Sequence, residues 1–289
     1  MSTTITSAGT PTDPAGSSRR ATLTFGGVLR SEWIKLRTVR STVWCYAIIL
    51  LLTVAFGLLL TATFNSRGIG PLPDDGQQAF ALQVTTLSIG FSQLVASVLG
   101  VLVISGEYGT GMIRSTFTAV PKRIPALLAK AIVFGLITFV VGLVSIVLTA
   151  LITAPILPGV GIEPDFGDSQ YLLGLGGGAL SLALVGLMSL AIGAIVRNSA
   201  AAIATSLGLL LVVPTVLQIL ASVTQTTWGL NVATFLPGSA SQALYSYGAE
   251  GSVINGVVSL SSLEGGLVMM AWVLALTVVA ALLIKRRDV

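Results

Sequence analysis

Few side chains of this 289-residue chain have the types and spacing that catalysis needs. The sequence contains no histidine and a single cysteine, Cys45, so it can assemble neither a Cys/His metal site nor an intrachain disulfide. Two glycine-rich stretches, 109–111 and 174–178, lack the GxxxxGKS or GxxxxGKT pattern whose lysine would reach the phosphates of a nucleotide. Serines are scattered along the apolar stretches without a histidine or a carboxylate pair to activate them. We therefore predict no catalytic residue, no cofactor site, no metal site and no enzyme activity for this chain.

Six long apolar stretches dominate the sequence. They cover residues 42–64, 82–104, 126–153, 171–196, 200–221 and 263–284. Each has at least about 20 residues, enough for a helix rising about 1.5 Å per residue to cross a hydrocarbon core roughly 30 Å thick. Hydrophobic residues make up 54% of the chain and charged residues 9%, whereas a soluble domain carries about 25% charged residues. The sequence predicts an all-α polytopic membrane protein with six transmembrane helices.

Charge alternates between the gaps that separate these stretches. Lysine and arginine gather before the first stretch, between the second and third, after the fourth and after the sixth, with Arg67 as the exception. The other gaps hold acidic residues, such as Asp75, Asp165 and Glu250. Because basic loops stay in the cytoplasm, we expect a multi-pass protein of the plasma membrane with both termini cytoplasmic. The net charge of +4 then reflects juxtamembrane bases that contact anionic membrane lipid, and we expect no nucleic-acid partner.

The apolar stretches carry almost no ionisable group. Lys130, about one turn inside the third, can extend to the cytoplasmic interface, and the polar residues deeper in the spans, such as Gln93 and Gln218, are neutral. Ion- and proton-coupled transporters generally place ionisable residues within the membrane, so the sequence disfavours that class but leaves an uncoupled pore open. Four glycines of the fourth stretch recur at near-helical spacing and predict close helix packing: Gly174, Gly178, Gly186 and Gly193.

The segment before the first stretch has two parts. Residues 1–26 begin with a run rich in Ser, Thr, Gly and Pro, and we expect a disordered cytoplasmic tail there. Residues 27–41 read GVLRSEWIKLRTVRS, with apolar side chains at helical spacing and basic side chains beside them. We predict an amphipathic helix that lies in the cytoplasmic headgroup layer and anchors the first span, with Trp33, Leu36 and Arg40 on one face. The interfacial residues of this helix are Trp33, Lys35, Leu36, Arg37 and Arg40.

The gap between the second and third stretches, residues 105–125, reads SGEYGTGMIRSTFTAVPKRIP. Thr110 is a suitable N-cap for a short helix that Pro121 would end. Such a helix would present apolar side chains rimmed by charge to the cytoplasm, which is typical of a docking surface for a partner. The alternative is a plain connection in which Glu107 and Arg114 only balance charge at the membrane surface. The predicted docking residues are Glu107, Tyr108, Gly109, Thr110, Gly111, Met112, Ile113, Arg114, Ser115 and Thr116.

Two further features concern the outer half of the predicted bundle. Pro214 lies within the fifth stretch and should kink it, because proline removes one backbone hydrogen bond and its ring clashes with the preceding turn. The gap at 222–262 holds aromatic residues such as Trp228 and Tyr247, which suit the membrane interface. We expect one short helix near Pro237 in this gap, lying on or dipping into the outer leaflet.

Taken together, these segments resemble the permease subunits of ABC-2-type transporters, especially the compact six-span permeases of the actinobacterial kind. The likeness rests on residues 31–42 (SEWIKLRTVRST), 106–116 (GEYGTGMIRST), 121–123, 129–130 and 235–238 (FLPG). It covers about residues 31–287, and it depends on the order of these motifs as much as on each motif alone. We accordingly treat 27–289 as one six-span permease domain.

The resemblance implies a function and a set of partners. In this family the helix before the first span lies along the cytoplasmic leaflet, and the segment between spans 2 and 3 is a coupling helix that docks in a separate ATP-binding subunit. The last outer loop forms short helices at the exit, and two permease copies or paralogues pair to form the pathway. The partner subunit binds ATP and Mg²⁺. The expected function is the membrane-spanning permease subunit of an ATP-driven exporter; the alternatives are a non-transporting membrane sensor or assembly protein, and an uncoupled channel.

Overall fold

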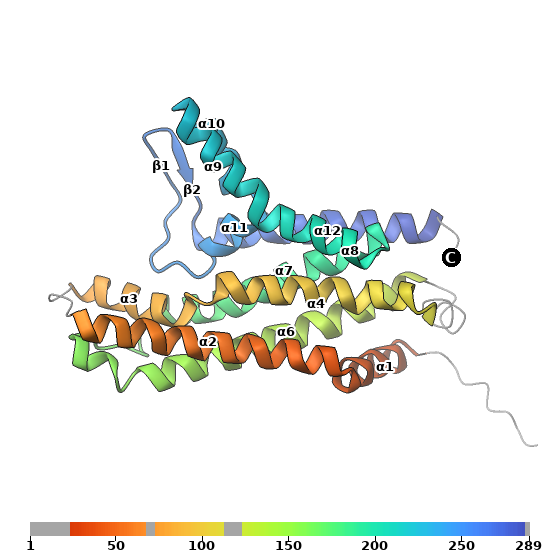
Figure 1. Ribbon diagram of the computed structural model, residues 1–289, viewed down its shortest axis with the longest axis horizontal. Helices are drawn as coiled ribbons and strands as arrows, with labels where there is room; N and C mark the ends of the chain where they lie inside the picture. Colours follow the sequence, from red (N-terminus) through yellow and green to blue (C-terminus); the bar gives the residue numbers. More distant parts are fainter. Residues whose placement is uncertain (1–23, 68–72, 113–122, 287–289) are drawn as a thin grey trace, which may run out of the picture.

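Six long apolar helical segments make up most of the part of the chain that the computed structural model describes, which is residues 24–67, 73–112 and 123–286. The candidate spans are Arg40–Phe64, Gly76–Gly109, Ile124–Thr153, Ser169–Val196, Ser199–Thr224 and Ser262–Arg286. Their number, order and apolar character confirm the predicted spans, and Figure 1 shows them as an elongated bundle. The predicted tail 1–26 lies outside the described residues except for 24–26, and α1 (Phe25–Thr38) already begins within it.

A single helix at the centre holds the bundle together. α7 (Ser169–Val196) is more deeply buried than the other candidate spans. It packs against α4 (Ile89–Gly109), α6 (Arg123–Thr153) and α12 (Ser262–Arg286), which lie around it in Figure 1. Its side chains enter all three apolar core clusters of the described residues. The first span, α2 (Arg40–Arg67), packs mainly on α6 and α4.

The glycines of α7 let the neighbouring helices approach closely. A Cβ added at Gly174 would overlap the side chain of Leu82, and one added at Gly186 would come within 2.9 Å of the Phe134 ring. A Cβ at Gly193 would come within 3.2 Å of the Val101 carbonyl oxygen. The predicted role of these glycines in helix packing is confirmed.

Two of the six candidate spans are interrupted within their length. The second consists of α3 (Asp74–Thr86) and α4, which are separated at residues 87–88. The fifth consists of α8 (Ser199–Leu207), the π-helical turn η2 (Gly208–Val212) and α9 (Val213–Thr224), with Pro214 in the first turn of α9. The proline has no N–H for the preceding turn, so a widened turn forms before it. In Figure 1 the chain bends away from α12 after α8, as the sequence predicts for Pro214.

The segment between the last two spans contains more elements than the single helix that its residues predict near Pro237, and the resemblance implies several short helices there. It contains α10 (Trp228–Thr234), α11 (Pro237–Ala243) and an antiparallel hairpin of β1 (Ser252–Ile254) and β2 (Val257–Ser259). The hairpin turns at Asn255 and Gly256, whose φ angles are 52° and 79°, as a two-residue type I′ turn requires. The indole of Trp272 donates a hydrogen bond to the Phe235 carbonyl and ties α12 to this region. A short 3₁₀ helix, η1 (Leu157–Val160), lies in the gap before α7.

Three serines of the spans form a hydrogen-bonded contact between helices. Ser97, Ser189 and Ser206 come from α4, α7 and α8, and their hydroxyls lie 2.6–2.9 Å from one another in a buried triangle. These three serines therefore hydrogen-bond between helices. Ser88 and Ser92 behave differently, because their buried hydroxyls have no hydrogen-bond partner among the described residues. Both lie at or just after the interruption of the second span.

Candidate functional site

A helix forms where the sequence predicts the interfacial helix, but it covers Phe25–Thr38 instead of 27–41. The Thr24 hydroxyl accepts a hydrogen bond from the Gly27 N–H at 3.3 Å, which satisfies one of the unpaired donors at the start of α1. At the other end Val39 is extended, with ψ 117°, and α2 begins one residue later. The predicted single helix over 27–41 is therefore two helices, and Arg40 belongs to the first span instead of the interfacial helix.

The face that α1 turns toward the bundle also differs from the predicted face. Leu36 is buried as expected, but Trp33 is 46% exposed. The buried residues of α1 are Val28, Glu32 and Leu36, which are spaced four residues apart and share one helix face. A helix face predicted from hydrophobicity alone omits Glu32. This side chain is buried because Lys130 and Lys35 pair with it.

Four charged side chains meet where α1 crosses the ends of α4 and α6, and we call them the charge cluster: Glu32, Lys35, Glu107 and Lys130. Lys130 Nζ lies 2.6 Å from Glu32 Oε2 and 2.8 Å from Glu107 Oε1. Lys35 Nζ lies 2.8 Å from Glu32 Oε1 and 3.0 Å from Glu107 Oε1. Two anions therefore face two cations, and each lysine bridges both acids. Arg37, two residues after Lys35, is exposed.

Burial and pairing act in opposite directions on the cluster. Burial alone would raise the pKa of Glu32, but Lys130 and Lys35 together outweigh it, and the pKa lies below its ordinary value of 4.5. Burial alone would lower the pKa of Lys35, but Glu32 and Glu107 outweigh it and hold the pKa above 10.5. Both shifts favour the charged forms of Glu32 and Lys35 at neutral pH.

The sequence predicts that Lys130 extends toward the membrane surface, but in the structure it does not. It is 4% exposed, and its ammonium group is enclosed between two carboxylates. Glu32 and Glu107 are equally buried, at 2% and 4% exposure. A lysine extends to water when nothing nearer offsets the loss of its hydration, and here the two acids do so. Sequence reasoning could not find this pairing, because the partners lie 98 and 23 positions away along the chain.

The structure divides the predicted docking segment into two parts. Glu107, Tyr108 and Gly109 form the last turn of α4. Thr110 is the C-cap of this helix, so the prediction of an N-cap there is wrong; its N–H and its hydroxyl both donate to the Gly106 carbonyl. Gly111 has φ 72°, a left-handed turn that glycine adopts without strain, and Met112 follows it with 44% exposure. The remaining docking residues, Ile113, Arg114, Ser115 and Thr116, lie outside the described residues.

A second contact fixes the end of α4 to the central helix. Arg197 caps the C-terminus of α7 in a left-handed conformation, with φ 59°. Its guanidinium carbon lies 5.2 Å from the centre of the Tyr108 ring, within the range of a cation–π interaction. The residues at the root of the predicted docking segment are thus held from both sides, by α1 and α6 through Glu107 and by α7 through Tyr108.

The helices that form this site lie in a part of the chain that matches a known protein family. The chain matches the family model of the ABC-2 family transporter protein over residues 28–216. This chain belongs to the ABC-2 transporter family. The match includes α1, the charge cluster and the first four spans, and it ends within α9. No curated protein matches the chain.

Membership confirms the resemblance drawn from the sequence and supports a permease role in an ABC transporter. Permeases of this family are membrane components that act with an ATP-binding partner. The described residues contain no group of three or more metal-ligating side chains. The charge cluster joins α1, α4 and α6 through ion pairs, and its geometry suits the fixing of these helices relative to one another.

Proposed function

We propose that this chain is the membrane-spanning permease subunit of an ATP-driven exporter in the plasma membrane. Both termini face the cytoplasm, a separate ATP-binding subunit hydrolyses ATP, and a second copy or paralogue completes the pathway. The observation that carries the proposal is the charge cluster. It joins α1 to the ends of α4 and α6, the two helices that bound residues 110–122.

The cluster explains how a docking event could move the spans. A force applied to a loop does not reach the neighbouring helices unless the loop is attached to rigid elements. Here the helix before the loop is bonded to the helix after it through Glu107 and Lys130. Lys130 of α6 is bonded to Glu32 of α1, and Glu107 of α4 is bonded to Lys35 of α1. Met112 is exposed just beyond this root and supplies an apolar contact for a partner. A force applied there would displace α1, α4 and α6 together.

The proposal is tested by the double variant Met112→Asp with Ile113→Asp. Two unpaired carboxylates in a desolvated docking surface typically lower association by several kcal/mol. We expect normal expression and membrane insertion, but loss of the ATP-binding subunit when the tagged chain is purified from native membranes. Photolabelling with 8-azido-ATP detects the ATP-binding subunit in the purified sample.

A matched control changes two adjacent apolar residues at the other end of the molecule. Val253 and Ile254 of the hairpin are 69% and 67% exposed, so Val253→Asp with Ile254→Asp adds the same charges far from the predicted docking segment. This control should retain the ATP-binding subunit. Equal retention by both double variants would contradict the assignment of the docking segment, and ion flux through liposomes without ATP would support a channel instead.

A further inference from the structure

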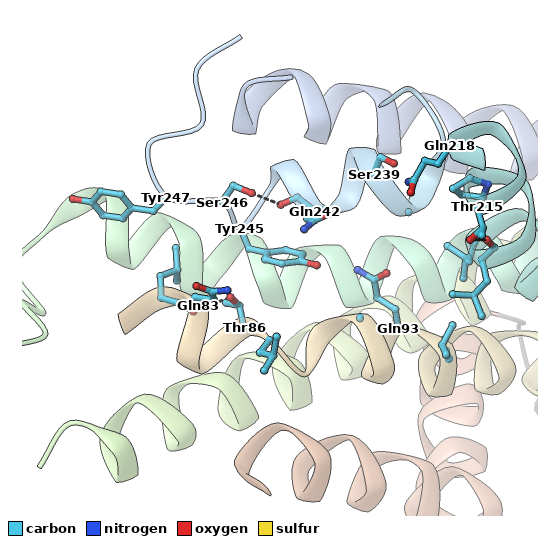
Figure 2. A pocket seen from close by; sticks show the side chains of 18 of the residues that line it. Gln83, Thr86, Gln93, Thr215, Gln218, Ser239, Gln242, Tyr245, Ser246 and Tyr247 are labelled. Carbon is cyan, nitrogen blue, oxygen red and sulfur yellow. Dashed lines mark hydrogen bonds between the residues drawn. The ribbon is translucent and has the colours of Figure 1, made fainter. Parts of the chain in front are cut away.

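A cavity of about 560 Å³ lies at the end of the bundle opposite the charge cluster. It lies between the interrupted second span, the widened turn of the fifth span and α11 (Figure 2). Its wall contains both interruptions, with Leu87 at the first and Leu210 and Pro214 at the second. Its volume falls in the range of about 300–1,000 Å³ that small-molecule sites occupy.

Four glutamines from different elements line this cavity: Gln83, Gln93, Gln218 and Gln242. Figure 2 shows Gln93 of α4 and Gln218 of α9 extending toward the same space. Gln93 is buried and fixed, because its Nε2 donates to Ser241 Oγ at 3.0 Å and to Ser181 Oγ at 3.3 Å. Its Oε1 takes part in neither bond and can accept a hydrogen bond from the cavity.

The other three glutamines are exposed. Gln83 and Gln218 belong to candidate spans, where an exposed amide facing lipid would have no hydrogen-bond partner. Their presence on the cavity wall therefore indicates that something other than hydrocarbon faces them. Water or a ligand with hydrogen-bonding groups meets this requirement.

Charge is missing from the cavity wall. No Asp, Glu, Lys or Arg is among its lining residues in the described part of the chain, and leucines alternate with the amides and hydroxyls. An ionised ligand would lose its hydration without gaining a counter-charge, which is strongly unfavourable. A neutral, partly apolar molecule would lose little hydration free energy on entering the cavity, because apolar contacts and hydrogen bonds there replace its contacts with water.

We propose that this cavity is the site where the exporter holds its substrate, and that the substrate is an uncharged amphipathic molecule bearing amide or hydroxyl groups. This inference rests on the proposed function. The interruptions in the cavity wall are suited to the role, because a π turn and a helix break can change conformation without unfolding a whole span.

The test uses the full chain in lipid nanodiscs, without an ATP-binding subunit. The probe is the neutral photolabel N-octyl-4-benzoylbenzamide, and labelled peptides are located by mass spectrometry. We expect labelling of peptides from 82–94 and 210–218 that an excess of N-octylbenzamide prevents. Two charged analogues, one ending in a quaternary ammonium and one in a carboxylate, should not compete. Octylbenzene, which has no hydrogen-bonding group, should compete much less than N-octylbenzamide.

Substitutions at Gln218 connect the labelling to the cavity. Gln218→Leu removes one hydrogen-bonding group and should weaken competition by N-octylbenzamide about two- to tenfold. Gln218→Glu should allow the quaternary ammonium analogue to compete. Gln170 is an exposed glutamine of α7 outside the cavity, so Gln170→Leu and Gln170→Glu serve as matched controls and should behave as the unmodified chain does.

Two results would overturn the inference. Labelling that no competitor prevents would show that the cavity holds no ligand of this class. Equal competition by octylbenzene would show a groove for lipid chains. Neither result touches the proposed exporter, whose own test is retention of the ATP-binding subunit. Conversely, loss of that subunit's association in the unmodified chain would reject the exporter while saturable labelling still established the binding site.

Discussion

At the scale of single residues, the charge cluster acts by fixing geometry. Buried ion pairs contribute little net stability, because the loss of hydration offsets most of their attraction. Breaking one is different, since the partner is left as an uncompensated buried charge. Lys130 contacts both acids of the cluster, and only Lys35, which is partly exposed, would remain to balance them.

Lys130→Met is therefore expected to lower the free energy of unfolding by about 3–5 kcal/mol. The measurement is the Tm of the purified chain in detergent. Lys285→Met, at an exposed position of α12, is the matched control and should change stability by less than about 0.5 kcal/mol. Adding Glu107→Gln to Lys130→Met should recover part of the loss, because Glu32 and Lys35 then balance each other. A double variant less stable than the single one would show that side-chain packing, not charge, controls this site.

The pKa of Glu32 gives the cluster a defined pH dependence. Because this pKa lies below 4.5, the stabilisation from ionised Glu32 is complete above pH 4.5 and is lost as the pH falls through the folded-state pKa. Lys35 has a raised pKa, so its contribution is complete below pH 10.5 and is lost only as the pH rises beyond that. Both contributions are present at neutral pH.

Glu32→Gln should therefore lower the Tm at pH 7, and the difference from the unmodified chain should shrink at a second, acidic pH below the lowered pKa, where Glu32 itself gains a proton. Thermal unfolding at both pH values measures this. Glu250→Gln removes a carboxylate from an exposed position in the hairpin region and should have little effect at either pH. A difference for Glu32→Gln that stays constant as the pH falls would mean that the carboxylate charge is not what stabilises the contact.

At the scale of elements, close contact between α4 and α7 depends on glycine. A Cβ added at Gly100 would overlap the Gly186 carbonyl oxygen, which belongs to the backbone and cannot turn away. Gly100→Ala should therefore separate the two helices and lower stability by about 1–3 kcal/mol. Gly106→Ala on the same helix meets open space and should be neutral or stabilising by up to about 1 kcal/mol. Measuring the Tm of both variants tests this prediction. Equal changes in Tm would contradict the close contact between Gly100 and the Gly186 backbone.

Much of the element structure could be predicted because hydropathy and length define a span. The interruption at 87–88 could not, since no proline or glycine marks it and the apolar pattern continues through it. Pro214 did indicate the widened turn of the fifth span. The hairpin also had a signal, because Asn255-Gly256 between apolar pairs is typical of a type I′ turn. It was missed because aromatic residues favoured an interfacial interpretation of the whole gap.

At the scale of the whole molecule, the charge cluster and the cavity lie toward opposite ends of α4. α4 contributes Glu107 to the cluster and Gln93 to the cavity wall. A displacement of the docking segment would thus reach the cavity along one continuous helix, which is the physical basis for coupling in the proposed exporter. The sequence predicted the basic end and its docking segment, but pairs such as Glu32 and Lys130 depend on tertiary contacts that periodicity does not encode.

Which end faces the cytoplasm is the remaining element of the proposal, and the charge pattern predicts it. In a chain with Cys45→Ser, cysteines at Asp165 and Glu250 should react with an impermeant maleimide in intact cells. Cysteines at Lys122 and Lys285 should react only after permeabilisation, because basic segments stay on the cytoplasmic side. The chain with Cys45→Ser alone gives the background. Labelling at 122 and 285 in intact cells would place the charge cluster outside, away from cytoplasmic ATP, and would contradict both the topology and the proposed exporter.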